Sequence, residues 1–163
     1  MNSKIVFIHG LESSSRGTKG LYFRERYPGM IVEDYPGTFA ERMETLERLL
    51  LGKTGLILVG SSYGGLMAAV YACLHEDKVR KLILLAPAIH LEEFNPCLDK
   101  RVSFPAVIIH GANDDVVPPE PVHKLAQRVF PLLQYHLLED DHALHGNFPL
   151  LDWDDLLDIR REP

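Results

Sequence analysis

The stretch LILVGSSYGG, residues 56–65, joins a short apolar run to a glycine-rich turn. Four apolar residues without alternation are typical of a strand that is covered on both faces. Leu66, Val70 and Leu74 follow at steps of four, which predicts a helix after the turn. The turn itself has the pattern G-x-S-x-G, and this pattern places Ser62 on a sharp strand-to-helix corner with its hydroxyl above the sheet edge.

The same succession of apolar runs and helical patterns continues along the chain. Further apolar runs occupy residues 5–8, 31–32, 82–85, 106–109 and 134–138, and further helical spacing occupies residues 39–50, 119–129 and 148–156. Strands that alternate with helices predict an α/β fold with a parallel, doubly wound sheet and helices on both faces. Right-handed crossovers then bring the loops that follow the strands to one edge, where ligands bind in open sheets of this kind.

The length of 163 residues predicts a single domain that spans residues 1–163, without a linker or an internal repeat. Residues 88–103 form the longest segment without a clear pattern, and we expect them to form a short cap over the site.

Charge and hydropathy exclude several function classes. The net charge is -6 and no basic stripe is present, so nucleic acid is not an expected partner. The apolar runs are too short for a signal peptide or a membrane span, so we expect a cytoplasmic protein. Cys73 and Cys97 are too few for a disulfide framework and are expected to be reduced thiols.

A serine hydroxyl becomes a strong nucleophile only when a base takes its proton, so Ser62 needs partners from elsewhere in the chain. Asp114 and Asp115 follow the run at 106–109, where a carboxylate could orient a histidine. His142 and His145 follow the run at 134–138. We prefer Asp114 and His142, and Asp115 and His145 remain the alternatives.

A metal site is the competing interpretation of the loop that follows the run at 134–138. Asp140, Asp141, His142 and His145 are residue types that bind metals. A metal there would leave the serine motif unexplained, so we predict neither a metal nor a cofactor.

The first loop completes the candidate site. His9-Gly10-Leu11 follows the run at 5–8, and the backbone N–H groups of Leu11 and Tyr63 are the expected donors to an oxyanion. Arg16 and Lys19 follow in the same loop. We expect them to be solvated surface charges, with contact to an anionic substrate group as the alternative.

The loop His9-Gly10, the turn GSSYGG, the stretch HGANDDVVP at residues 110–118 and the late Asp-His pair together resemble the α/β-hydrolase superfamily. Within it, HGLESS at residues 9–14, GSS at residues 60–62 and His142-Ala143 are similar to the small bacterial YqiA-type esterases. The resemblance implies that Ser62 is the nucleophile, Asp114 the triad acid and His142 the general base.

The resemblance also predicts the order of the strands. The common fold of the superfamily has eight strands, and the six found here lack the first two. The expected sheet is therefore a minimal, mostly parallel one in the order 2-1-3-4-5-6. A large lid domain is also missing.

We therefore predict a serine hydrolase that cleaves small carboxylic esters through an acyl-enzyme intermediate. A thioesterase or a small-peptide hydrolase with the same triad is the first alternative. The second is a non-catalytic binding module, because a fold does not fix a function. The expected partner is a small-molecule ester or a related acyl compound, and a homo-oligomer is possible.

Overall fold

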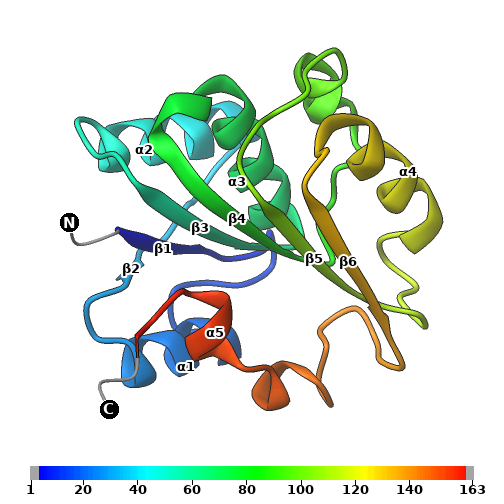
Figure 1. Cartoon of the computed structure of the whole chain (residues 1–163). Coiled ribbons are helices and arrows are strands. Elements are labelled where there is room, and N and C mark those ends of the chain that lie inside the picture. Colours follow the sequence, from blue (N-terminus) through cyan, green and yellow to red (C-terminus); the bar gives the residue numbers. More distant parts are fainter. Residues whose placement is uncertain (1–3, 161–163) are drawn as a thin grey trace.

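A computed structural model describes residues 4–160 and contains one sheet of six parallel strands (Figure 1). The strands are β1 (Ile5–Ile8), β2 (Ile31–Val32), β3 (Leu56–Ser61), β4 (Val79–Leu85), β5 (Ala106–Gly111) and β6 (Leu133–Leu138). Their order is β2-β1-β3-β4-β5-β6. The predicted fold class and strand order are confirmed, and the sheet is wholly parallel where the sequence predicted a mostly parallel one.

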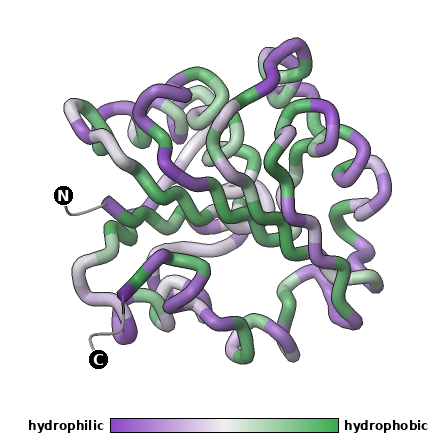
Figure 2. Tube along the Cα trace, viewed as in Figure 1, coloured by the Kyte–Doolittle hydropathy of each residue, from purple (hydrophilic) through white to green (hydrophobic). Residues whose placement is uncertain are grey.

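Helices cover both faces of this sheet. Helices α2 (Phe39–Leu50), α3 (Tyr63–Leu74) and α4 (Pro119–Val129) lie on one face, and α1 (Thr18–Arg26) and α5 (Trp153–Leu156) lie on the other (Figure 1). Successive strand residues point to opposite faces, so Leu58 packs in the core beneath α3 while Val59 packs in the core on the α1 side. Figure 2 shows the central strands as hydrophobic, which agrees with burial on both faces.

Two helices differ from the sequence-based expectation. Helix α1 was not predicted, because Gly20 and Phe23 are its only buried residues and Gly17 provides no side-chain cap. The helix expected over residues 148–156 is wrong as a single element. It is divided into the 3₁₀ turn η3 (Phe148–Leu150) and the short α5, because Leu151 is extended between them.

The segment expected to act as a cap follows β4 and contains a second 3₁₀ turn, η2 (Glu92–Cys97). Phe94 and Cys97 are buried in the core with α3, which anchors the segment beside the carboxyl edge of the sheet. The two cysteines, Cys73 and Cys97, are both buried and unbridged. Within residues 4–160 no helix is both long and apolar enough to cross a membrane.

Candidate active site

Ser62 lies at the corner between β3 and α3 with a strained backbone. Its φ is 56° and its ψ is -114°, a conformation that L-residues rarely adopt. Neighbouring backbone groups hold this conformation. The Ser62 N–H donates to the carbonyl of Leu85 (2.9 Å), and its own carbonyl accepts from the N–H groups of Leu66 (3.1 Å) and Ala88 (3.0 Å). The serine side chain is thereby raised from the sheet edge.

Two glycines of the G-x-S-x-G pattern allow this corner to form. A Cβ at Gly64 would overlap the backbone carbonyls of Ile8 and His9, and a Cβ at Gly60 would lie 2.7 Å from Cα of Gly65. A side chain at either position would push α3 away from β1 or β3. The sequence motif therefore has a direct steric reason in the structure.

The structure joins Ser62, His142 and Asp114 by two consecutive hydrogen bonds. The Ser62 hydroxyl donates to Nε2 of His142 over 3.0 Å. Nδ1–H of His142 donates to Oδ2 of Asp114 over 2.7 Å. The imidazole is therefore oriented by the carboxylate on one side and faces the hydroxyl on the other. This is the geometry that general-base activation of a serine needs.

The Asp114 carboxylate is fully buried, and hydrogen bonds from the protein replace those it would make with water. Its Oδ1 accepts from the N–H groups of Val116 and Val117, each at 2.8 Å. Burial alone would raise the pKa of Asp114, but the hydrogen bonds from His142 and from these two N–H groups outweigh it and leave the pKa below its usual value. Asp114 therefore stays ionised beside the histidine. Asp115, the alternative, is exposed on the same turn.

His110 is a buried partner of this carboxylate to which the sequence interpretation gave no role in the site. Its Nε2–H is shared between Oδ2 of Asp114 (3.1 Å) and the carbonyl of Val117 (3.0 Å). Burial lowers the pKa of His110, so the ring is neutral and acts as a hydrogen-bond donor. A histidine four residues before the acid was the available signal for this role.

The loop that carries His142 is held by its own carboxylates. Oδ1 of Asp140 accepts from the N–H of Asp141 (2.8 Å), and Oδ2 accepts from the backbone and side-chain nitrogens of Asn147 (2.8 and 2.9 Å). Asp141 in turn binds Nδ1 of His145 (2.6 Å). His145 is 77% exposed and takes no part in the line of hydrogen bonds to Ser62. Within residues 4–160 no three metal-ligating side chains converge, here or elsewhere.

The two expected oxyanion donors lie beside the serine. Leu11 and Tyr63 both line the cavity that contains Ser62, and neither N–H donates to another group within residues 4–160. The loop before Leu11 is close, since a Cβ at Gly10 would be 3.6 Å from Cβ of Ser62. A donor pair of this kind stabilises the negative charge of a tetrahedral intermediate.

Arg42 contacts both residues expected to supply the oxyanion donors, Leu11 and Tyr63, and was not found from the sequence. It is 6% exposed on α2, its Nη2 donates weakly to the carbonyl of Leu11 (3.5 Å), and its guanidinium lies 5.5 Å from the ring centroid of Tyr63. Its Nε–H donates to the carbonyl of Gly37 (2.9 Å). The helical pattern of residues 39–50 gives no reason to expect a buried arginine at this position.

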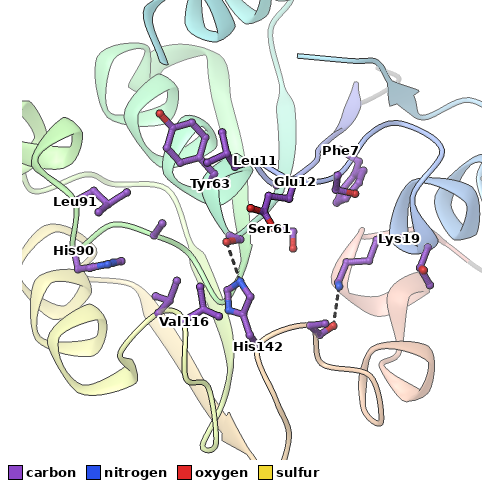
Figure 3. A pocket seen from close by; sticks show the side chains of 17 residues that line it. Phe7, Leu11, Glu12, Lys19, Ser61, Tyr63, His90, Leu91, Val116 and His142 are labelled. Carbon is purple, nitrogen blue, oxygen red and sulfur yellow. Dashed lines mark hydrogen bonds between the residues drawn. The ribbon is translucent and has the colours of Figure 1, made fainter. Parts of the chain in front are cut away.

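A cavity of about 600 Å³ surrounds the Ser62 hydroxyl. On one side of His142 lie His90 and Leu91 from the cap segment, and on the other lies Lys19 (Figure 3). Lys19 was expected to be a solvated surface charge, whereas in the structure it is half-buried and lines this cavity. Arg16 is exposed, as expected, and does not line the cavity.

Comparison with known proteins identifies relatives of this fold. A family model described as alpha/beta hydrolase fold matches residues 9–101. No match to the sequence is found among curated proteins.

Several solved structures are similar over nearly the whole chain. Alpha/beta hydrolase domain-containing protein 10 from mouse is 23% identical with a TM-score of 0.79, and the match covers 97% of this chain and 92% of that one. A putative YdeN-like hydrolase from Pectobacterium atrosepticum is 20% identical with a TM-score of 0.75, covering 97% and 89%. Est1E from Butyrivibrio proteoclasticus is 15% identical with a TM-score of 0.72, covering 91% and 83%.

Proposed function

Because this chain belongs to the alpha/beta hydrolase fold family, we propose that it is a serine hydrolase that cleaves small carboxylic esters. The observation that carries the proposal is the continuous line of hydrogen bonds from Ser62 through His142 to Asp114. The fold alone would not support this proposal, since proteins with the same fold serve many functions.

The geometry supports a two-step acyl transfer. Ser62 attacks the ester carbonyl while Nε2 of His142 takes the hydroxyl proton, and the Leu11 and Tyr63 N–H groups stabilise the oxyanion. His142 then protonates the leaving alcohol. As the alcohol departs, the acyl group stays bound to Ser62 as the acyl-enzyme. In the second step His142 deprotonates a water molecule, and the resulting hydroxide attacks the acyl carbon. Collapse of this second tetrahedral intermediate breaks the bond to Ser62 and releases the carboxylic acid, while His142 returns its proton to the serine oxygen. Asp114 stabilises the charged imidazole in both steps.

Names of structural neighbours favour acyl chemistry of this kind. Est1E has been solved with ferulic acid bound, and another neighbour is a monoacylglycerol lipase from Paleococcus ferrophilus, 17% identical to this chain. Both names point to compounds with a carboxylic acyl group. Thioesters and small peptides are the related substrates, because the same triad can expel a thiolate or an amine.

The first test compares 4-nitrophenyl acetate hydrolysis by the wild type and by Ser62→Ala. We expect a loss of three or more orders of magnitude, about what removal of a triad member costs. Ser103→Ala is the matched control, because that hydroxyl binds Glu76 away from the cavity and its loss leaves turnover unchanged. A fluorophosphonate probe should label the wild type and the control, but not Ser62→Ala.

Two results would contradict the proposal. Equal, slow hydrolysis by the wild type and Ser62→Ala, together with no labelling, would indicate a binding module with an idle triad. If the probe labels Ser62 but the protein turns over only thioesters or peptides, Ser62 would still be the nucleophile. The proposed ester substrates would then be wrong.

A further inference from the structure

Lys19 is a cationic side chain inside the cavity for which the proposed mechanism has no use. It lies in the first turn of α1 and lines the same cavity as Ser62. Figure 3 places it on the side of His142 opposite His90 and Leu91. A substrate whose carbonyl lies at Ser62 can therefore place one of its ends near Lys19.

The ammonium group has unused hydrogen-bonding capacity. It donates one hydrogen bond, to the carbonyl of Ala143 at 2.7 Å, although a lysine has three N–H donors. Lys81 and Lys124 pair with carboxylates, whereas no carboxylate within residues 4–160 pairs with Lys19. The carbonyl of Ala143 and the ring of Phe148, whose centroid is 5.4 Å from the nitrogen, are neutral partners, so the ammonium has no anion in direct contact among the described residues.

The surroundings of Lys19 make this charge costly unless an anion joins it. Burial lowers the pKa of Lys19, because partial removal from water disfavours the charged ammonium. Asp141 and Asp140 act on it in the opposite direction, from a distance. Both carboxylates are already engaged, Asp140 with backbone N–H groups and Asn147, and Asp141 with His145. A partly desolvated cation of this kind is well suited to an anionic ligand.

We propose that the substrate is an acyl compound that carries a carboxylate or a similar anionic group, and that Lys19 binds this group. The inference rests on the proposed ester hydrolysis and deepens it by naming a substrate class. Glu12 also lines the cavity and is exposed, and its charge repels an anion from that part of the rim. An anionic group is therefore favoured at the Lys19 end of the cavity and disfavoured near Glu12.

The anion could belong to the acyl part or to the alcohol part of the ester. For the acyl part, mono-4-nitrophenyl adipate is compared with 4-nitrophenyl heptanoate. For the alcohol part, 4-carboxyphenyl acetate is compared with 4-methylphenyl acetate. The kcat/KM for the charged ester is divided by that for its neutral partner, in the wild type, Lys19→Met, Lys19→Arg and Lys124→Met.

We expect the ratio to fall about 10- to 100-fold in Lys19→Met for the ester whose anion reaches Lys19, which is the usual size of a charged hydrogen bond. Lys19→Arg should retain most of the ratio, and the exposed control Lys124→Met should leave it unchanged. The pair of esters that responds identifies the part of the substrate that carries the anion.

An unchanged ratio in Lys19→Met would overturn the inference. If every ester then slowed equally, Lys19 would act only by holding the His142 loop through Ala143.

A binding experiment separates failure of this inference from failure of the proposed hydrolysis. Binding of monomethyl adipate, 4-carboxyphenyl acetate and methyl heptanoate is measured with Ser62→Ala, with and without Lys19→Met. If the wild type cleaves no ester, Lys19-dependent binding of one of the charged compounds alone would still support the anion site, and its absence would overturn it.

Discussion

At the scale of single residues, the orientation of His142 depends on one carboxylate, that of Asp114. Asparagine at this position presents an NH₂ group to the imidazole and favours the wrong tautomer. We therefore expect Asp114→Asn to lower kcat by about 10,000-fold. Asp115→Asn is the matched control, because that side chain is exposed one residue away and should leave kcat within a factor of two. The measurement is ester hydrolysis by the two variants, and equal losses would show that the acid was assigned wrongly.

The same residues mark the limit of inference from the sequence. Ser62 could be predicted from the G-x-S-x-G pattern directly after a strand, and His142 was preferred to His145 because it lies nearer the end of the strand before it. Asp114 and Asp115 could not be separated by position, since the backbone turn that donates the Val116 and Val117 N–H groups decides which carboxylate faces inward. Lys19 was expected to be solvated because its partner, Ala143, lies 124 residues away.

At the scale of elements, helices with a wide apolar face were predicted and those with a narrow one were not. Helix α2 was predicted because apolar residues recur at helical spacing over residues 39–50. In the structure a capping box of Thr38 and Glu41 also closes its N-terminus. Helix α1 buries only Gly20 and Phe23, so no periodic signal was present. This helix nevertheless carries Lys19 into the cavity. The helix with the weakest hydrophobic periodicity is thus the one that holds the candidate anion site.

The loop that carries His142 is an element held by the charge of Asp140. Asparagine has a single acceptor oxygen, so Asp140→Asn loses the bonds to either Asp141 or Asn147. We expect kcat to fall roughly 10- to 100-fold, the cost of a small misplacement of a reacting group. Asp99→Asn is the control, because Asp99 is almost fully exposed and should not change kcat. Unchanged turnover by Asp140→Asn would show that this carboxylate does not position the histidine.

The same carboxylate makes part of the stability pH-dependent. Burial alone would raise the pKa of Asp140, but hydrogen bonds from Asn147, Asp141 and Gly146 outweigh it and hold the pKa at about 2. A depressed pKa in the folded state stabilises the protein above the unfolded pKa near 3.9, and this contribution is lost as the pH falls through about 2. Urea unfolding should show the wild type more stable than Asp140→Asn by about 1 kcal/mol at pH 7, after allowance for solvent screening. A difference that persists below pH 2 would exclude the charge as its source.

At the scale of the whole molecule, one sheet joins two cores. Adjacent residues of β3, such as Leu58 and Val59, are buried in opposite cores, so displacement of this strand would disrupt both cores at once. The proposed triad lies along the carboxyl edge of this sheet, with Ser62 after β3, Asp114 after β5 and His142 after β6. The positions of these three side chains therefore depend on the integrity of the whole sheet.

The single tryptophan allows this coupling to be measured. Trp153 is 1% exposed in the core on the α1 side, where its ring meets that of Phe23 at 4.8 Å and its Nε1–H donates to the carbonyl of Phe148 (3.1 Å). We expect tryptophan fluorescence and far-ultraviolet circular dichroism to give the same urea midpoint, as in two-state unfolding. Trp153→Ala should lower the midpoint by the equivalent of about 3–5 kcal/mol. A fluorescence transition at lower urea would instead show that the face covered by α1 and α5 opens first, and Lys19 would then leave the cavity before the triad is lost.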